Sequence, residues 1–279
     1  DHVTLNGLLL PIRRGFDQCV CLRPSYLYDG VESPLRDKPP GSIDILVFRE
    51  NTEGEYANIG GRLYADRPQD VAIQTAVFTR HGCRRIITAA FEKAATRPAR
   101  YVASITKSNA QGYGMVLWDE VFEEVAAGFP DIETESLLID RAVMEFVRRP
   151  ESFDVVVASN LFGDILTDLA AIIVGSMGLA ASANIDPTRT YPSMFEPVHG
   201  SAPDIVGQGI ANPLAAILSA AMMLEHLQLP RAAVAINDAV KQQLAQRGPR
   251  TPDVGGDSTT EQTGEAIAAR VASTTGAVS

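Results

Sequence analysis

The chain has 279 residues, of which 46% are hydrophobic, so it is long enough to bury a substantial core and to form two domains. Its 24 basic and 34 acidic side chains give a formal net charge of −10, which argues against a nucleic acid or an anionic membrane surface as a partner. We recognise no signal peptide and no apolar run long enough to cross a bilayer. The three cysteines (Cys19, Cys21 and Cys83) lack metal-finger spacing and indicate reduced thiols, so we expect a cytoplasmic protein.

Strand and helix signals alternate through most of the chain, which is typical of an α/β protein with crossover units. The period and composition of the apolar residues predict strands over 42–48, 71–79, 101–106, 133–139 and 153–159, and the first two are expected to be buried. They predict helices from 82 to 97 and around Trp118, a residue we expect in the core. From about Gly175 the composition shifts to loop residues, through Tyr191 to Pro213, and helices are predicted over 214–227, 232–246 and 265–272.

The segment from Asn160 to Asp168 follows the apolar run 153–159 and places Asp164 and Asp168 four residues apart. On a helix this spacing puts both carboxylates on one face, where they can share a cation. A strand that runs directly into the helix places these acids at the carboxyl edge of a sheet, where open α/β folds bind ligands. An amphipathic helix with two solvated aspartates would explain the same pattern.

Three arginines, Arg13, Arg23 and Arg49, suit a di- or tricarboxylate, because guanidinium groups bind carboxylates in a bidentate way. This interpretation requires all three to converge, whereas a single arginine is usually a surface residue. Tyr56 follows Arg49 by seven residues and could donate a proton, although half-buried structural tyrosines are commoner.

Lys107 and Asp140 each follow a predicted strand, so they share the carboxyl edge expected for Asp164 and Asp168. Three aspartates without histidine or cysteine companions suit a hard divalent cation such as Mg²⁺ or Mn²⁺.

The loop from Glu196 to Pro213 is rich in small residues that would let a backbone approach a nucleotide closely. Within it, Asp204 could accept hydrogen bonds from ribose hydroxyls and repel an additional phosphate. The sequence contains no G-x-G-x-x-G fingerprint, so a Rossmann domain is not supported. Plain turn structure remains an alternative for this loop.

These motifs resemble those of the isocitrate and isopropylmalate dehydrogenase family, the decarboxylating β-hydroxyacid dehydrogenases. The resemblance runs along the whole chain, and its most specific segments are Leu22-Arg23-Pro24, the stretch from Arg49 to Tyr56, Thr106-Lys107-Ser108-Asn109, Asn160 to Leu169, and Glu196 to Pro213. The opening segment Asp1 to Gly7, Glu50 to Tyr56 and Ala158 to Phe162 look most like the tartrate and D-malate dehydrogenase branch.

The resemblance implies an α/β two-domain fold of the isopropylmalate dehydrogenase type, with the active site in the cleft between the domains. The larger, cofactor-binding domain would comprise residues 1–18 and 175–279, and the smaller domain, 19–174, would carry the dimer contacts. Relatives begin with roughly eighty further residues that supply the first strands of the larger domain. We therefore expect the larger domain to be incomplete here and the chain alone to be a poor catalyst.

Residue roles follow from the same resemblance. Arg13, Arg23 and Arg49 would bind the substrate carboxylate, Tyr56 would be the general acid, and Lys107 the catalytic lysine. Asp140, Asp164 and Asp168 would hold the metal, and the family implies a homodimer in which Lys107 and Asp140 complete the partner's site. The adenosine pocket would be lined by His199, Gly200, Ser201, Ala202, Asp204 and Asn212. Asp204 stands where NADP-dependent relatives carry the lysine of a lysine-tyrosine pair, which implies NAD.

The implied activity is NAD- and metal-dependent oxidative decarboxylation of a small 2-hydroxy dicarboxylate. Asn6 replaces the tryptophan usual in tartrate-type relatives, and Cys21 replaces an asparagine, so the substrate itself stays open. Leu9 and Leu10 could form an apolar wall for 3-isopropylmalate instead. An inactive remnant or a binding-only subunit is the alternative from another class.

Overall fold

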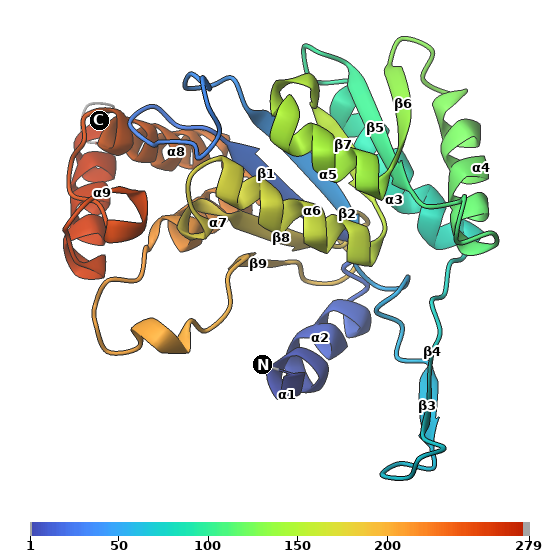
Figure 1. Cartoon of the computed structure of the whole chain (residues 1–279). Coiled ribbons are helices and arrows are strands. Elements are labelled where there is room, and N and C mark those ends of the chain that lie inside the picture. Colours follow the sequence, from blue (N-terminus) through green and yellow to red (C-terminus); the bar gives the residue numbers. More distant parts are fainter. Residues whose placement is uncertain (1, 276–279) are drawn as a thin grey trace.

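The computed structural model describes the backbone of residues 2–275, in which seven strands form one sheet in the order β6-β5-β7-β2-β1-β8-β9. Helices lie on both faces of this sheet (Figure 1). The arrangement is the mixed α/β fold that the sequence predicts. None of the described helices combines the length and the apolarity needed to span a membrane.

The parallel half of the sheet contains β2 (Asp44–Glu50), β7 (Val155–Ala158), β5 (Tyr101–Thr106) and β6 (Glu133–Leu138). All four residues of β7 are fully buried, as expected for a central parallel strand covered by helices on both faces. The predicted strands at 42–48, 101–106, 133–139 and 153–159 are therefore confirmed, with small differences at their ends.

The antiparallel half begins with β1 (Val20–Tyr26), which pairs with β2 along its whole length. On its other side β1 pairs with β8 (Ala181–Ile185) at only three positions, and β9 (Met194–Pro197) follows β8 at the edge. The sequence did not predict β1, β8 or β9, and both β8 and β9 lie in the segment expected to be a loop. Arginine, proline and small residues interrupt the apolar pattern of these strands, so period alone does not detect them.

The helices agree with the predicted positions more closely. They are α1 (His2–Thr4), a π-helical segment (Leu5–Leu9), α2 (Leu10–Gly15), α3 (Arg80–Ala94), α4 (Gly114–Ala126), α5 (Ile139–Arg148), α6 (Asn160–Ile173), α7 (Leu214–His226), α8 (Pro230–Ala245) and α9 (Thr260–Thr275). Single 3₁₀ turns occur at Pro150–Ser152, Met177–Leu179, Pro203–Ile205 and Pro252–Val254. Helix α9 begins five residues before the predicted start at 265.

Buried hydrophobic side chains form two clusters. The first draws all its buried members from residues 19–174 and includes Trp118, which is fully buried and donates its indole N–H to Ser104 Oγ at 2.9 Å. The second draws its members from residues 179–267 together with Val31. The predicted role of Trp118 in the core is confirmed.

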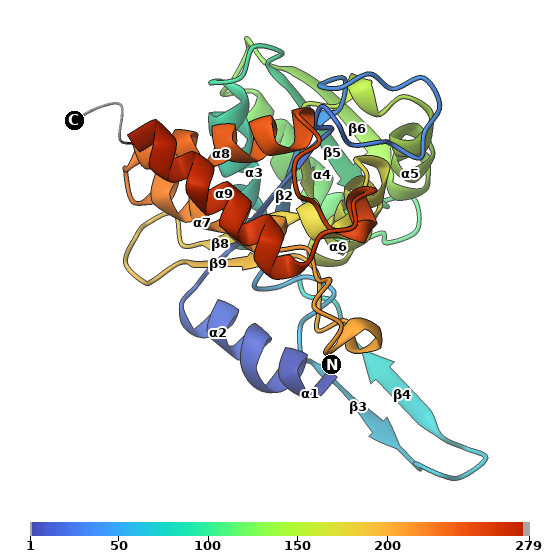
Figure 2. The same ribbon diagram turned by 90° about the vertical axis from the view of Figure 1, so that its left-hand side faces the viewer.

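One predicted strand differs from the expectation. Residues 71–79 were expected to form a buried strand, but only β4 (Val71–Gln74) is extended, and it pairs solely with β3 (Gly60–Leu63) in a separate two-stranded ribbon. Every residue of both strands is exposed. The ribbon projects away from the main sheet in both views (Figures 1 and 2), and none of the described helices covers it.

Candidate active site

Asp164, on the first turns of α6, is the centre of a cluster of charged side chains. Its Oδ1 atom accepts from Arg23 Nη1 at 3.2 Å and also pairs with Arg49. Its Oδ2 atom accepts from the phenol of Tyr56 at 2.7 Å. The structure thus brings together four residues that the sequence singled out separately.

The alternation of the two central strands directs these arginines to one face of the sheet. In the β1–β2 register Arg23 lies opposite Val47 and Arg49 opposite Cys21, so both arginines point toward α6. Helix α6 can approach closely because Gly163 lacks a side chain: a Cβ atom there would lie 2.7 Å from Arg49 Cβ.

Two further residues of α6 hold the arginines in place. Asn160 Oδ1 accepts from Arg49 at 3.2 and 2.8 Å, and Thr167 Oγ1 accepts from Arg23 Nη1 at 2.6 Å. Neither residue is among those predicted from the sequence. Their spacing from Asp164 places them on the same face of the helix, so helical phase could have identified them.

The two aspartates of α6 have opposite electrostatic environments. Burial raises the pKa of Asp164, but the charges of Arg49 and Arg23 outweigh burial and the net pKa is lowered. Burial and then the charge of Asp164 raise the pKa of Asp168. A cation placed between the two carboxylates would relieve this repulsion, so the donor set fits a hard divalent metal ion.

Arg13 reaches the same region from α2. It is 4% exposed and donates to Glu196 Oε1 at 3.0 Å, and its positive charge is close enough to contribute, after burial and Arg23, to a lowered pKa of Arg49. The buried Nε atoms of Arg13 and Arg23 have no hydrogen-bond partner within the described part of the chain. These two guanidinium groups thus keep a buried donor without a partner, which suits an anionic ligand.

Lys107 and Asp140 form a pair of their own. Lys107 follows β5 and Asp140 lies at the start of α5, and their side chains are joined by an ion pair of 2.5 Å that lowers the pKa of Asp140. No ion pair among residues 2–275 links them to Asp164 or Asp168. Within these residues no three acidic, histidine or cysteine side chains gather as a metal site, so the expected three-aspartate set does not assemble within one chain.

The predicted nucleotide loop lies between β9 and α7. His199, Gly200, Ser201 and Asp204 are exposed, and Ala202 has a left-handed backbone with φ of 44°. Asn212 is anchored more firmly: its side chain donates to Asp253 at 2.9 Å and accepts from the backbone N–H of Leu214 at the start of α7. Asp204 itself is exposed in the protein alone.

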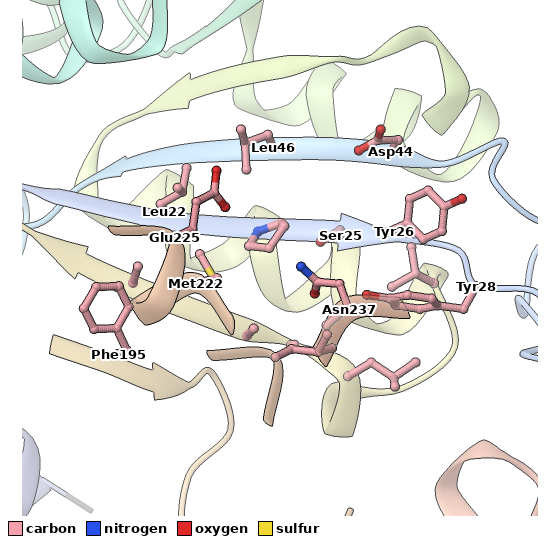
Figure 3. A pocket seen from close by; sticks show the side chains of 18 of the residues that line it. Leu22, Ser25, Tyr26, Tyr28, Asp44, Leu46, Phe195, Met222, Glu225 and Asn237 are labelled. Atoms are coloured by element: carbon pink, nitrogen blue, oxygen red, sulfur yellow. The ribbon is translucent and has the colours of Figure 1, made fainter. Parts of the chain in front are cut away.

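Two cavities lie near these elements. One of about 350 Å³ is bounded by Tyr56 and Glu55, by Asn6 of the π-helical segment and by Leu10 of α2. The other, of about 580 Å³, lies on the opposite face of the sheet, between α3 and α7, and contains none of the predicted site residues. Figure 3 shows Leu22 and Leu46 on its sheet side with Phe195 and Met222 nearby. Because side chains alternate along β1, this cavity is separated from Arg23 and Arg49 by the sheet itself.

Comparison with known proteins adds sequence relatives. The chain is 48% identical over 272 residues to a probable tartrate dehydrogenase/decarboxylase of Agrobacterium vitis, covering 98% of this chain and 76% of that protein. It is 50% identical over 272 residues to the D-malate dehydrogenase (decarboxylating) of Escherichia coli, covering 96% and 75%. It is also 50% identical over 266 residues to a 3-isopropylmalate dehydrogenase of Thermobifida fusca, covering 95% and 74%.

A solved structure agrees with these relatives. Isocitrate dehydrogenase from Methylococcus capsulatus superimposes with a TM-score of 0.88 at 40% sequence identity, covering 95% of this chain and 76% of that chain. The model of the family described as isocitrate/isopropylmalate dehydrogenase matches residues 1–267. The chain therefore belongs to the isocitrate/isopropylmalate dehydrogenase family.

Proposed function

We propose that this decarboxylating dehydrogenase oxidises a small 2-hydroxy dicarboxylate of the tartrate or D-malate type, with NAD as acceptor and Mg²⁺ or Mn²⁺ as the metal. The observation that carries the proposal is the contact of Arg23 and Arg49 with Asp164, next to Asp168, with Arg13 close enough for its charge to affect the pKa of Arg49. The names of the relatives at 48% and 50% identity support the substrate class.

The chain's own residues supply binding and proton transfer. The guanidinium groups of Arg13, Arg23 and Arg49 hold the distal carboxylate, which keeps the reacting carbon in register. Asp164 and Asp168 would hold the divalent cation. When bound, the cation would polarise the substrate oxygens and NAD would accept a hydride.

Tyr56 and Lys107 are the proposed proton-transfer residues. Lys107, directly or through water, would help to remove the hydroxyl proton, and Tyr56 would supply a proton to carbon after loss of CO₂. Burial and the hydrogen bond to Asp164 raise the pKa of Tyr56. The phenol therefore carries its proton at neutral pH, as a general acid must.

We further propose a homodimer in which Lys107 and Asp140 of one protomer complete the site of the other. Their separation from Asp164 within one chain supports this arrangement. Helices α5 and α6 also expose large apolar side chains that a partner could cover: Met144, Val147, Ile165 and Ile172 are 48–61% exposed.

The preference for NAD rests on Asp204, because a carboxylate near the adenosine ribose repels a 2′-phosphate. The remaining predicted loop residues, His199, Gly200, Ser201, Ala202 and Asn212, would line the adenosine pocket. A cytoplasmic location agrees with three free, buried cysteines.

The domain division also remains a proposal. The buried members of the first cluster end at Val174 in the sequence, and those of the second, apart from Val31, begin at Leu179. This change supports a smaller domain of 19–174 and a larger one of 1–18 and 175–279, with the site between them.

An observation also favours 3-isopropylmalate as the alternative substrate. Leu10 lines the cavity beside Tyr56, where it could contact the isopropyl group of this substrate. Leu9 does not line this cavity. The T. fusca relative has this activity in its name at 50% identity.

The deciding experiment measures NADH formation with D-malate, tartrate and 3-isopropylmalate, each with Mg²⁺, with Mn²⁺ and after complete chelation. The proposal predicts turnover of D-malate or tartrate that chelation abolishes. Preference for 3-isopropylmalate would select the alternative. Undiminished activity without divalent metal would contradict the metal requirement, and no turnover of any substrate would favour a binding-only or inactive subunit.

A further inference from the structure

The loop between β2 and Tyr56 is attached to the start of α6 by an acidic side chain. Glu55 Oε1 accepts from Ser159 Oγ at 2.7 Å, and Glu55 Oε2 accepts from the backbone N–H of Leu161 at 3.1 Å. Ser159, the residue before the helix, makes no side-chain cap of its own, and the first turn of α6 contains no acidic residue. Glu55 therefore supplies from a distant segment the carboxylate that caps this helix.

The same loop follows the helix closely at two other points. Asn160 Nδ2 donates to the carbonyl oxygen of Glu53 at 3.0 Å. Gly54, with φ of +78°, lies so near α6 that an added Cβ would be 3.2 Å from Asn160 Cβ. Loop and helix thus form one packed unit at the carboxyl edge of the sheet.

Glu55 and Tyr56 contact successive parts of α6. Glu55 binds the N–H of Leu161, and the next residue, Tyr56, donates its phenol to Asp164 at 2.7 Å. Leu161 and Asp164 are three residues apart, about one helical turn. The contact of the Glu55 carboxylate with α6 thereby fixes the position of the neighbouring Tyr56 Cα atom relative to the aspartates of the helix.

We infer that Glu55 is the positioning residue for the proton-donating tyrosine, aligning Tyr56 with α6 by capping that helix. The inference rests on the proposed function for its catalytic readout, but the geometry it describes is independent of the substrate. Arg14 also donates to the Tyr56 carbonyl oxygen, and Gly54 exchanges backbone hydrogen bonds with Val77 at 2.7 and 3.0 Å. Loss of the Glu55 contacts should therefore displace the tyrosine without releasing the loop.

Glu53 offers a matched control in the same loop. Its carboxylate accepts from the backbone N–H and the hydroxyl of Thr79, both at 2.9 Å, at the start of α3. This contact is chemically similar to that of Glu55, but α3 carries none of the proposed site residues. E53A should lower stability in the same way as E55A without moving Tyr56 relative to α6.

The catalytic test is a double-mutant cycle. E55A should lower kcat by about 100-fold, the effect of a misplacement near 1 Å, with little change in KM. E55Q, which keeps one acceptor oxygen, should retain an intermediate kcat. If Glu55 acts through Tyr56, E55A should cost little further activity in a Y56F background, whereas E53A should have the same small effect in both backgrounds. Full additivity of E55A with Y56F would overturn the inference.

A second measurement does not depend on turnover. The ¹³C chemical shift of the Tyr56 ring carbon Cζ, assigned with Y56F and recorded at one fixed pH, should move in E55A and remain in place in E53A. S159A should produce a smaller shift in the same direction and serves if E55A does not fold. An unmoved signal in E55A, or in S159A if that variant is used, would overturn the inference. If the signal moves in E55A but the wild-type protein turns over none of the substrates, the positioning role is upheld and only the proposed function is rejected.

Discussion

The phenol of Tyr56 donates a hydrogen bond of 2.7 Å to Asp164, a residue 108 positions later in the sequence. The proposed general acid and a proposed metal ligand are thus in direct contact in the protein alone. The guanidinium group of Arg49 lies 5.3 Å from the Tyr56 ring centre and also pairs with Asp164. Binding of a cation at Asp164 must therefore compete with these donors and would alter the environment of the tyrosine.

Mixing inactive variants should restore activity if protomers share sites. We expect K107A and D164N to be inactive alone, because each lacks one component of every site. After random exchange of protomers, half of the dimers carry one intact site, so the mixture should recover about a quarter of wild-type activity. The control mixes D164N with D168N, which damage the same half-site and should give no recovery. Absence of recovery in the first mixture would contradict the shared site.

Asp168→Asn should stabilise the metal-free protein at neutral pH. Because the pKa of Asp168 is raised, its ionised form costs stability above that folded pKa, and the cost disappears as the pH falls through it to the ordinary aspartate range. The residue is exposed, so the gain should be below about 1 kcal/mol. Thermal unfolding at pH 7.5 and at low pH, where the two proteins should converge, checks the sign.

The same variant should respond less to divalent metal. Wild-type protein should gain about 2.7 kcal/mol when Mg²⁺ or Mn²⁺ is at 100 times its Kd, because binding to the folded state shifts unfolding by mass action. D168N should gain much less at the same concentration. Equal stabilisation of both proteins, measured by urea unfolding, would show that Asp168 is not a ligand.

Replacement of Asp204 by lysine together with Ile205 by tyrosine should shift the cofactor preference toward NADP. The carboxylate would repel a 2′-phosphate, whereas lysine would attract it. Because Asp204 is exposed, solvent screens this interaction, and we expect a change of about tenfold in the ratio of Kd values. Binding titrations with both cofactors provide the measurement, and an unchanged ratio would place Asp204 away from the ribose.

Gly163→Ala should weaken substrate binding through Arg49. The new methyl group would lie 2.7 Å from Arg49 Cβ and Cγ, so the buried arginine must move, at a cost of about 1–3 kcal/mol. We expect a higher KM for the dicarboxylate and an unchanged Kd for NAD. Gly264→Ala in α9, where an added Cβ has nothing within 4 Å, is the matched control and should leave both unchanged.

The sequence predicted β2 and β7 of the parallel half well because they are largely apolar runs, with β7 apolar throughout. It missed β1 because Arg23, Pro24 and Ser25 interrupt the pattern, although the neighbours β2 and β8 supply the pairing that makes the strand. It placed residues 71–79 in the interior because alternation does not indicate whether a strand has a covered face.

The candidate site shows the same limit. Spacing identified Asp164 and Asp168 because both lie on one helix face, and the structure adds Asn160 and Thr167 to that face. The contact of Arg13 with Glu196 joins residues 183 positions apart, so no local pattern could reveal it. Nor could spacing show that Lys107 pairs with Asp140 and not with the acids of α6.

The short ladder between β1 and β8 has a mechanical consequence. Seven residues of β1 pair with β2, but only Val20, Cys21 and Leu22 pair with β8. The β1–β8 ladder is therefore one of the two shortest in the sheet, with that between β5 and β7, and a force that separates β1 from β8 would bend the backbone just beyond it. Arg23 is the first residue past that point, and its guanidinium group holds Asp164. Bending of the sheet at this point would move Arg23 and so alter its ion pair with Asp164. Motion of the sheet would thereby be coupled to the proposed metal-binding helix.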